Sequence, residues 1–227
     1  MAGYDVLNEA VLDNTAKLNV FYKKVIKAIR GVDQDHILFI EGNRWAMDLG
    51  GLTDFNDDNL CLSVHFYLPL DFTFNFVPHL RYPLRSPGSP GKVFNKSAMD
   101  KVLAKYRAVS RKRAAPIFVG EFGVNTRQGY YGEDRWLKDV LACFEKAEFH
   151  WTYWTYKAIK NAIFPDGIYS YMDNPPWVSR HGHRLGWDNY SSYWPKHSGA
   201  MIRSWKTEQF TENREILRIL KTFLKKR

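Results

Sequence analysis

The chain has 227 residues, enough for one large domain with a substantial hydrophobic core. Its net charge at pH 7 is +9, and much of the positive charge lies in residues 110–115 and 221–227, next to predicted helix ends. No RNA-recognition, zinc-finger or helix-turn-helix motif accompanies this charge, so the sequence does not favour nucleic-acid binding. The sequence also shows no signal peptide and no apolar run long enough to cross a membrane, which leaves the localisation open.

Aromatic residues make up 16% of the sequence, including 8 Trp and 13 Tyr. Such a surplus either fills an aromatic core or forms a flat binding surface, for which sugars are an obvious ligand. The two cysteines, Cys61 and Cys143, each fall inside an apolar stretch, which predicts buried free thiols rather than a disulfide. His181 and His183 have the spacing of a short metal-ligand pair, but no third ligand is near them in the sequence, so we predict no metal site.

Strand and helix patterns alternate along the chain. Apolar runs rich in β-formers predict strands, and amphipathic stretches that follow polar caps predict helices. Asp13 or Asn14 suits the N-cap of the first helix, and Asn95 or Ser97 suits that of the second. The expected strands are 4–8, 36–42, 59–69, 115–123 and 150–158; the expected helices are 12–30, 95–115, 132–149 and 211–225, with a short helix or loop after residue 42. Long loops rich in aromatic residues are expected from 69 to 94 and from 159 to 200.

This βα alternation predicts an α/β fold, with a parallel sheet and helices outside it. Two layouts satisfy it, an open doubly wound sheet and a (β/α)8 barrel. No glycine-rich phosphate-binding motif is present, so a nucleotide-binding open sheet has no support. We therefore expect a TIM-barrel type of fold in a single domain over residues 1–227, with functional residues at the carboxyl ends of the strands.

Two glutamates, Glu9 and Glu121, each follow an apolar run at a predicted strand end. Cleavage of a glycosidic bond needs two carboxyl groups, one protonated and one ionised, which lie roughly 5–5.5 Å apart in retaining enzymes. We therefore take these two glutamates as the candidate catalytic pair. The polar and aromatic residues at the predicted strand ends are Asn8, Glu9, Glu41, His65, Tyr67, Glu121 and Trp154.

The remaining residues of this rim suit sugar recognition. Asn8 is expected to bind a sugar 2-hydroxyl, His65 another hydroxyl, and Tyr67 an oxygen of the nucleophile. Trp154 is expected to stack on a sugar face. Each of these residues alone is more often structural, and a lone histidine on a buried strand is usually a satisfied core residue. This chemistry requires neither a metal nor an organic cofactor.

The motifs LNEA, HFY, GEFG and WTYWTYK, in this order, resemble the carboxyl-terminal portion of glycoside hydrolase family 5, the cellulase-type retaining β-glycanases. In that family Asn-Glu ends barrel strand 4, His-x-Tyr ends strand 6, Gly-Glu-Phe/Trp-Gly ends strand 7, and a Trp ends strand 8. The resemblance implies that Glu9 is the acid/base and Glu121 the nucleophile. It also implies that Trp45 contributes to a leaving-group subsite, while Ala10 replaces the proline that usually follows Asn-Glu. The neighbours implied for the catalytic pair are Asn8, His65, Tyr67 and Trp154.

The same resemblance implies a partial barrel that lacks the first three βα units. An arginine and a histidine that those units supply in the family have no counterpart in this sequence. A five-stranded sheet has open edges, here expected near 4–8 and 150–155, and open edges invite pairing with another chain. The chain can therefore pair with a second copy, pack alone under its long loops, or be completed by a separate amino-terminal fragment. We predict a homodimer through the open edges.

The function predicted from this resemblance is a retaining glycoside hydrolase that cleaves β-1,4-glucan, with a polysaccharide as its partner. The alternative is a weakly active or inactive truncated barrel that binds polysaccharide without efficient turnover. The catalytic residues do not separate glucan from mannan or other β-glycans. That choice depends on the loops 69–94 and 159–200.

Overall fold

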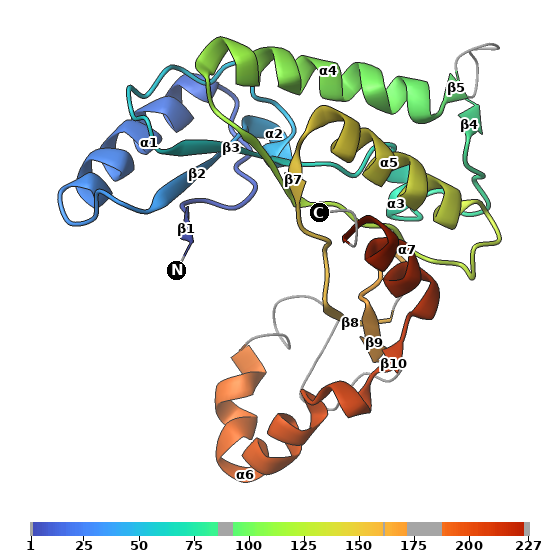
Figure 1. The fold of residues 1–227 in the computed structure, drawn as a ribbon. Helices are drawn as coiled ribbons and strands as arrows, with labels where there is room; N and C mark the ends of the chain where they lie inside the picture. Colours follow the sequence, from blue (N-terminus) through green and yellow to red (C-terminus); the bar gives the residue numbers. More distant parts are fainter. Residues whose placement is uncertain (1, 86–92, 161, 172–187, 225–227) are drawn as a thin grey trace.

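A computed structural model describes residues 2–85, 93–160, 162–171 and 188–224 of the chain. Its centre is a five-stranded parallel sheet in the order β1-β2-β3-β6-β7 (Figure 1). Each strand is joined to the next by a helix or a helical loop, as the βα alternation predicted. The strands are β1 (Gly3–Asp5), β2 (Ile37–Glu41), β3 (Leu60–His65), β6 (Ile117–Glu121) and β7 (His150–Trp151).

The predicted helices are confirmed, with ends at most three residues inside the expected ones. Of the two caps considered for each, Asn14 caps α1 through a bond from the Ala16 amide, and Asn95 caps α4 through a bond from the Ala98 amide. The acidic start of α5 is also present. The helices are α1 (Thr15–Arg30), α2 (Asn43–Ala46), α3 (Leu70–Thr73), α4 (Lys96–Arg113), α5 (Glu133–Ala147), α6 (Asp188–Ser204) and α7 (Arg214–Leu224), with a 3-10 turn at Thr207–Gln209. No helix in the described ranges is long and apolar enough to span a membrane.

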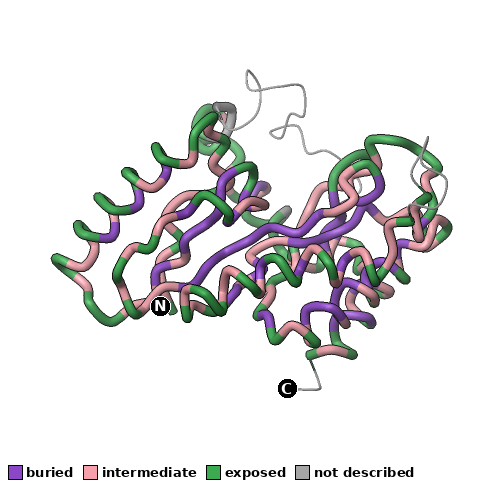
Figure 2. Tube along the Cα trace, turned by 90° about the horizontal axis from the view of Figure 1, so that it is seen from above, coloured by how far each residue is buried: buried purple, intermediate pink, exposed green. Residues whose placement is uncertain are grey.

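The hydrophobic core lies between the sheet and the helices. In Figure 2 the central strands form a continuous buried band, whereas the helices are buried on one side only and exposed on the other. Leu38, Ile40 and Val64 point from the strands into the same cluster as Trp136 of α5, which is 0% exposed. Cys61 and Cys143 are buried and free, as predicted.

The opposite face of the sheet is less covered. Phe39 on β2 and Phe118 on β6 alternate along their strands with the core residues, and their rings contact each other with centroids 5.1 Å apart. Both side chains are only half-buried and lie outside the core cluster. β1 and β7 are the two edge strands, so the open edges expected near 4–8 and 150–155 are present.

Several predicted strands have different limits from those expected. The strand expected at 59–69 ends at His65, and that expected at 115–123 covers only Ile117–Glu121. The first strand ends at Asp5 rather than at residue 8, because β1 pairs with β2 only over Gly3–Asp5. The stretch 150–158 is two strands, because β7 ends at Trp151 and residues 157–159 join another sheet. Residues 152–154 continue to bond to β6 and to the residue that follows it, since the Thr152 amide donates to the Val119 carbonyl and the Trp154 amide to the Phe122 carbonyl. This second sheet has the order β10-β9-β8, with β8 (Lys157–Ile159), β9 (Tyr169–Tyr171) and β10 (Thr211–Glu212).

The two expected loops contain regular structure. The loop 69–94 includes α3 and a short hairpin of β4 (Leu84–Arg85) and β5 (Val93–Phe94). The loop 159–200 includes β9 and most of α6, so the prediction of one long loop there is wrong. His181 and His183 lie outside the described residues.

Candidate active site

An irregularity between β3 and β6 decides which way Glu121 points. Ser63 pairs with Phe118 and Val64 with Val119, but the register then shifts, so that His65 pairs with Glu121 and Gly120 is the extra residue. Without this shift, strict alternation would turn Glu121 towards the helices. A glycine fits closely here, since a Cβ at residue 120 would lie 3.0 Å from Ser63 Oγ and 3.4 Å from His65 Nε2, and these side chains would have to move by a few tenths of an ångström.

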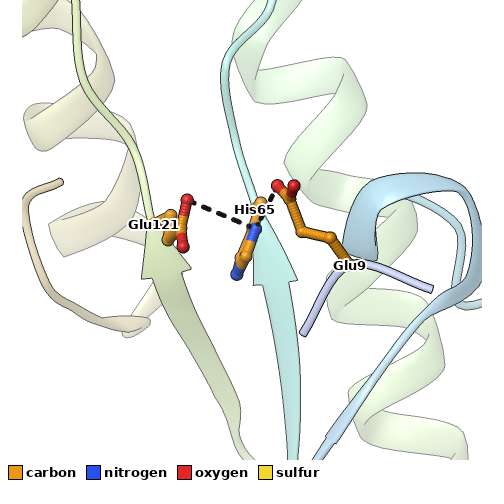
Figure 3. A group of neighbouring side chains, drawn as sticks. All are labelled: Glu9, His65 and Glu121. Carbon is orange, nitrogen blue, oxygen red and sulfur yellow. Dashed lines mark hydrogen bonds and ion pairs between the residues drawn. The ribbon is translucent and has the colours of Figure 1, made fainter. Parts of the chain in front are cut away.

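Glu9, His65 and Glu121 meet at this edge of the sheet, from three different elements (Figure 3). His65 Nδ1 lies 2.8 Å from Glu9 Oε1 and 3.6 Å from Glu121 Oε2. One nitrogen or oxygen from each of the three side chains lies within 4.8 Å of the others. Tyr67, two residues after His65, donates its hydroxyl to Glu121 Oε2 at 2.7 Å. The structure thus brings together four of the residues predicted from the sequence.

Glu41 lies directly behind this group at the end of β2. Its side chain is 0% exposed, and its Oε1 lies 3.1 Å from His65 Nε2. Its Oε2 accepts the main-chain N–H of Glu9 at 2.6 Å, and its main-chain oxygen accepts the Tyr22 hydroxyl at 3.0 Å. Glu9 has a φ of 52°, in the left-handed region that a residue with a side chain seldom adopts.

Burial and charge shift the proton affinities of the site. Burial lowers the pKa of His65, but its polar contacts with Glu41 and Glu9 and the charge of Glu121 outweigh this and raise it to about 9. Burial raises the pKa of Glu121, while the Tyr67 hydrogen bond and the positive charge of His65 oppose the increase. Burial and the nearby Glu121 carboxylate raise the pKa of Tyr67, so its hydroxyl keeps its proton. The ring of His65 is therefore a cation among carboxylates at neutral pH.

His65 differs from its predicted contact with a sugar hydroxyl. Its side chain is only 2% exposed, and both ring nitrogens already contact carboxylates. The buried position follows from β3, whose residues Cys61 to His65 are all buried. In this structure the ring connects the acids to one another, and no ring nitrogen is left for a ligand.

The other predicted residues lie around this group with more exposure. Asn8 is exposed next to Glu9. Trp45 is 51% exposed, and its amide donates to the Ala10 carbonyl at 3.3 Å, which ties the turn after β2 to the segment that carries Glu9. Trp154 is 38% exposed, just after β7.

An aromatic group extends from Tyr67 over the segments that follow β3 and β8. The Phe74 ring contacts those of Tyr67, Phe76 and Phe164, with centroids 4.9, 5.2 and 5.6 Å apart. Phe76 and Phe164 are each 50% exposed. The Phe164 amide donates to the Phe74 carbonyl at 3.1 Å, and this bond holds the two loops together. A cavity of about 590 Å³ opens between Phe164 and Trp154, lined also by Lys157, Ile159 and Ile163.

Glu9, His65 and Glu121 also have the ligand types of a metal site. The raised pKa of His65, about 9, indicates that its ring carries a proton, and so a positive charge among these carboxylates, at neutral pH. A metal ion would have to displace that proton before His65 Nδ1 could become a ligand.

Two carboxylates that face each other at the carboxyl ends of parallel strands, with an aromatic surface beside them, define the class of the protein. It is a partial (β/α) barrel with two carboxylates at the edge of the sheet where functional residues of such barrels lie. Residues 2–160 match the model of the family described as Cellulase (glycosyl hydrolase family 5), and the chain belongs to this family.

Individual relatives agree with this assignment. Endoglucanase C of Acetivibrio thermocellus is 25% identical over 189 residues, covering 71% of this chain and 55% of its own length. A β-xylosidase of Phanerodontia chrysosporium is 29% identical over 175 residues, covering 70% of this chain and 34% of its own length. The chain thus spans about half or less of the length of these curated relatives.

Solved structures show the same partial overlap. The cellulose synthase subunit Z of Clostridioides difficile has a TM-score of 0.59 and 26% identity, with 74% of this chain and 55% of that chain covered. A hyperthermophilic endo-β-1,4-glucanase solved with its substrate has a TM-score of 0.59 and 25% identity, with 74% and 53% covered. The resemblance to family 5 and the partial barrel predicted from the sequence are both confirmed.

The sequence placed Glu41 at a strand end but assigned it no function. The position of Glu41 could have indicated a role in the site, since it ends the apolar run Ile37–Glu41 just as Glu121 ends Ile117–Glu121. The register shift at Gly120 had no comparable signal, because it depends on pairing with β3.

Proposed function

We propose that the site is that of a retaining glycoside hydrolase acting on β-1,4-glucan, with Glu121 as nucleophile and Glu9 as acid/base. The observation that carries this proposal is the separation of the two acids. At least one oxygen of Glu9 lies within 4.8 Å of an oxygen of Glu121, which agrees better with the roughly 5–5.5 Å between the carboxyl groups of a double-displacement pair than with the roughly 6.5–9.5 Å of inverting enzymes.

The surroundings of each acid suit its proposed step. Tyr67 holds Glu121 Oε2, so the other oxygen is available to attack the anomeric carbon. As that bond forms, the bond to the leaving sugar breaks and Glu9 gives its proton to the leaving oxygen. Glu9 then removes a proton from water, the water attacks the anomeric carbon, and the ester bond to Glu121 breaks.

The flanking aromatic residues support a polymeric substrate. Trp45 lies on the Glu9 side of the site, where the leaving part of the chain would bind. Phe76, Phe164 and Trp154 are exposed on the Glu121 side. Aromatic faces at several points along a cleft favour a chain of pyranose rings over a single sugar. The similarity to Endoglucanase C supports glucan as that polymer.

A second candidate function is binding of polysaccharide without efficient turnover. The observation that favours it is the span of the chain, which covers about half of Endoglucanase C. No described residue fills the roles of the arginine and histidine that the family resemblance placed in earlier strands.

Hydrolysis of carboxymethyl-cellulose, mannan and xylan separates the two functions. The wild type is compared with Glu121→Gln and Glu9→Gln, and Glu208→Gln, an exposed glutamate in the 3-10 turn, is the control. Hydrolysis of the glucan that is lost in both site variants and kept in the control supports the enzyme. Retention of the wild type and of Glu121→Gln on a cellulose affinity gel, with no hydrolysis by either, supports the binding protein.

We also propose that two copies associate through the open edges. Among the described residues β1 and β7 are the outer strands of the sheet, and Phe39 and Phe118 lie on its less covered face. Sedimentation of the chain from low to high micromolar concentration tests this. A monomer throughout that range would rule out the dimer.

A further inference from the structure

Glu41 is a buried acid that the proposed reaction does not use. Its carboxylate is fully buried, and its cationic neighbour among the described residues is His65. A buried carboxylate without a compensating charge is strongly disfavoured, so the position demands a partner such as this ring. The ring is itself 2% exposed, which makes the pair a fixed internal feature rather than a surface contact.

We propose that Glu41 is a positioning residue, which fixes the main chain of Glu9 and keeps a proton on the pair formed by His65 and Glu9. This inference rests on the proposed role of Glu9. One carboxylate performs both tasks, because Oε2 accepts the Glu9 N–H at 2.6 Å and Oε1 faces His65 Nε2 at 3.1 Å. The bond to the amide stabilises Glu9 at its unusual φ of 52°.

The negative charge of Glu41 Oε1, 3.1 Å from Nε2, also favours a proton on the ring, although no aligned hydrogen bond joins these two atoms. On the other side of the ring, Nδ1 faces Glu9 Oε1 at 2.8 Å and can either donate a proton to it or accept one from it. Moving that one proton converts an imidazolium and a carboxylate into a neutral imidazole and a carboxylic acid. The carboxylic acid is the form of Glu9 that protonates a leaving oxygen, so a proton kept on this pair is a proton available for catalysis.

The negative charges around the His65 ring also favour keeping a proton on the pair formed by His65 and Glu9. The negative charge of Glu41 opposes loss of the shared proton, and so does Glu121, whose Oε2 is 3.6 Å from Nδ1. Asp5 on β1 is the other acid that interacts with the ring; partial desolvation and the Glu41 charge raise its own pKa to about 6. The Tyr67 hydroxyl donates to the Glu121 carboxylate, and the Tyr22 hydroxyl donates to the main-chain carbonyl of Glu41. The raised pKa of His65 agrees with this arrangement.

The test is Glu41→Gln, which keeps the size of the side chain and an oxygen for the Glu9 amide but removes the charge. The pKa of His65 is measured from its ring signals by NMR titration, in the wild type, in Glu41→Gln and in the control Glu208→Gln. We expect the substitution to lower the pKa of His65 by about one unit or more, and the control to leave it unchanged. An unchanged pKa in Glu41→Gln overturns the proposal.

This measurement does not require turnover, so it separates the role of Glu41 from the proposed function. Absence of hydrolysis by the wild type would refute the function, while the titration still decides whether Glu41 controls the proton. Where the wild type is active, the basic limb of its kcat/KM profile should move to lower pH in Glu41→Gln. A uniform loss of activity at every pH would instead indicate a merely structural role.

Glu41→Asp is the second variant, in case the glutamine variant does not fold. It keeps the charge, so we expect His65 to retain a pKa above its ordinary value of about 6.5. A return to the ordinary value in a folded aspartate variant overturns the proposal.

Discussion

Replacing Tyr67 with phenylalanine removes a single hydroxyl from the site. That hydroxyl is buried and donates to Glu121 Oε2 at 2.7 Å, so its loss deprives the ionised acid of its hydrogen bond. A hydrogen bond to a charged group contributes about 1.5–3 kcal/mol. At about 1.36 kcal/mol per pH unit, the pKa of Glu121 should rise by about one to two units in Tyr67→Phe.

The sign of this change follows from the ionised form of the acid. Glu121 must be a carboxylate to attack, so a higher pKa moves the acidic limb of the kcat/KM profile to higher pH. The same shift should appear, without any substrate, in the pH titration of the ¹³C-carboxyl signal of Glu121. Tyr130→Phe is a matched control, because it removes the same hydroxyl from a side chain that is 72% exposed.

Glu121→Gln assigns the carboxyl signal, because the signal disappears in that variant. A Glu121 pKa in Tyr67→Phe that equals or lies below the wild-type value would refute the reasoning. It would mean that the cation at His65, 3.6 Å away, stabilises the carboxylate without help from the hydroxyl.

Three further predictions concern stability. The free energy of unfolding should fall by at most roughly 3 kcal/mol as pH rises from about 6.5 to about 9, because the folded state holds the His65 proton more tightly than the unfolded state does. A free energy of unfolding, measured with denaturant, that stays constant over this pH range would contradict the prediction. Trp136→Ala should lower the free energy of unfolding in urea by about 3–5 kcal/mol, since the side chain is 0% exposed and its Nε1 donates to the Leu68 carbonyl at 3.0 Å. A decrease below about 1 kcal/mol would show that the core adjusts to fill the cavity. Asn14→Ala should lower the free energy of unfolding by about 1 kcal/mol, because the cap on the Ala16 amide is lost, whereas Asn14→Asp should keep most of the wild-type stability. Equal melting temperatures for the wild type and the alanine variant would exclude the cap as a stabilising contact.

The sequence by itself determined the order of the elements and the residues at the strand ends. Apolar runs such as Ile37–Glu41 and Ile117–Glu121 predict strands of a parallel sheet, because such strands usually have both faces covered; here one face, with Phe39 and Phe118, is only half-buried. Polar caps such as Asn14 and Asn95 mark helix starts, because a side chain there satisfies a free amide. These signals are local, so they can be read without knowing which segments meet. The placement of Glu9 and Glu121 at one edge of the sheet followed from one further rule, that parallel strands end at the same edge, but the distance between them did not.

Only the tertiary structure decided the orientation and protonation of the site. The register shift at Gly120 exists because β6 pairs with β3, and it turns Glu121 towards His65. The burial of His65 between Glu9 and Glu41 joins residues from three elements, and the proton on its ring depends on all of these charges at once. The division of residues 150–158 between two sheets likewise depends on β9, which follows only later in the chain. Pairing partners and electrostatic neighbours lie far apart in sequence, so no local pattern could have specified them.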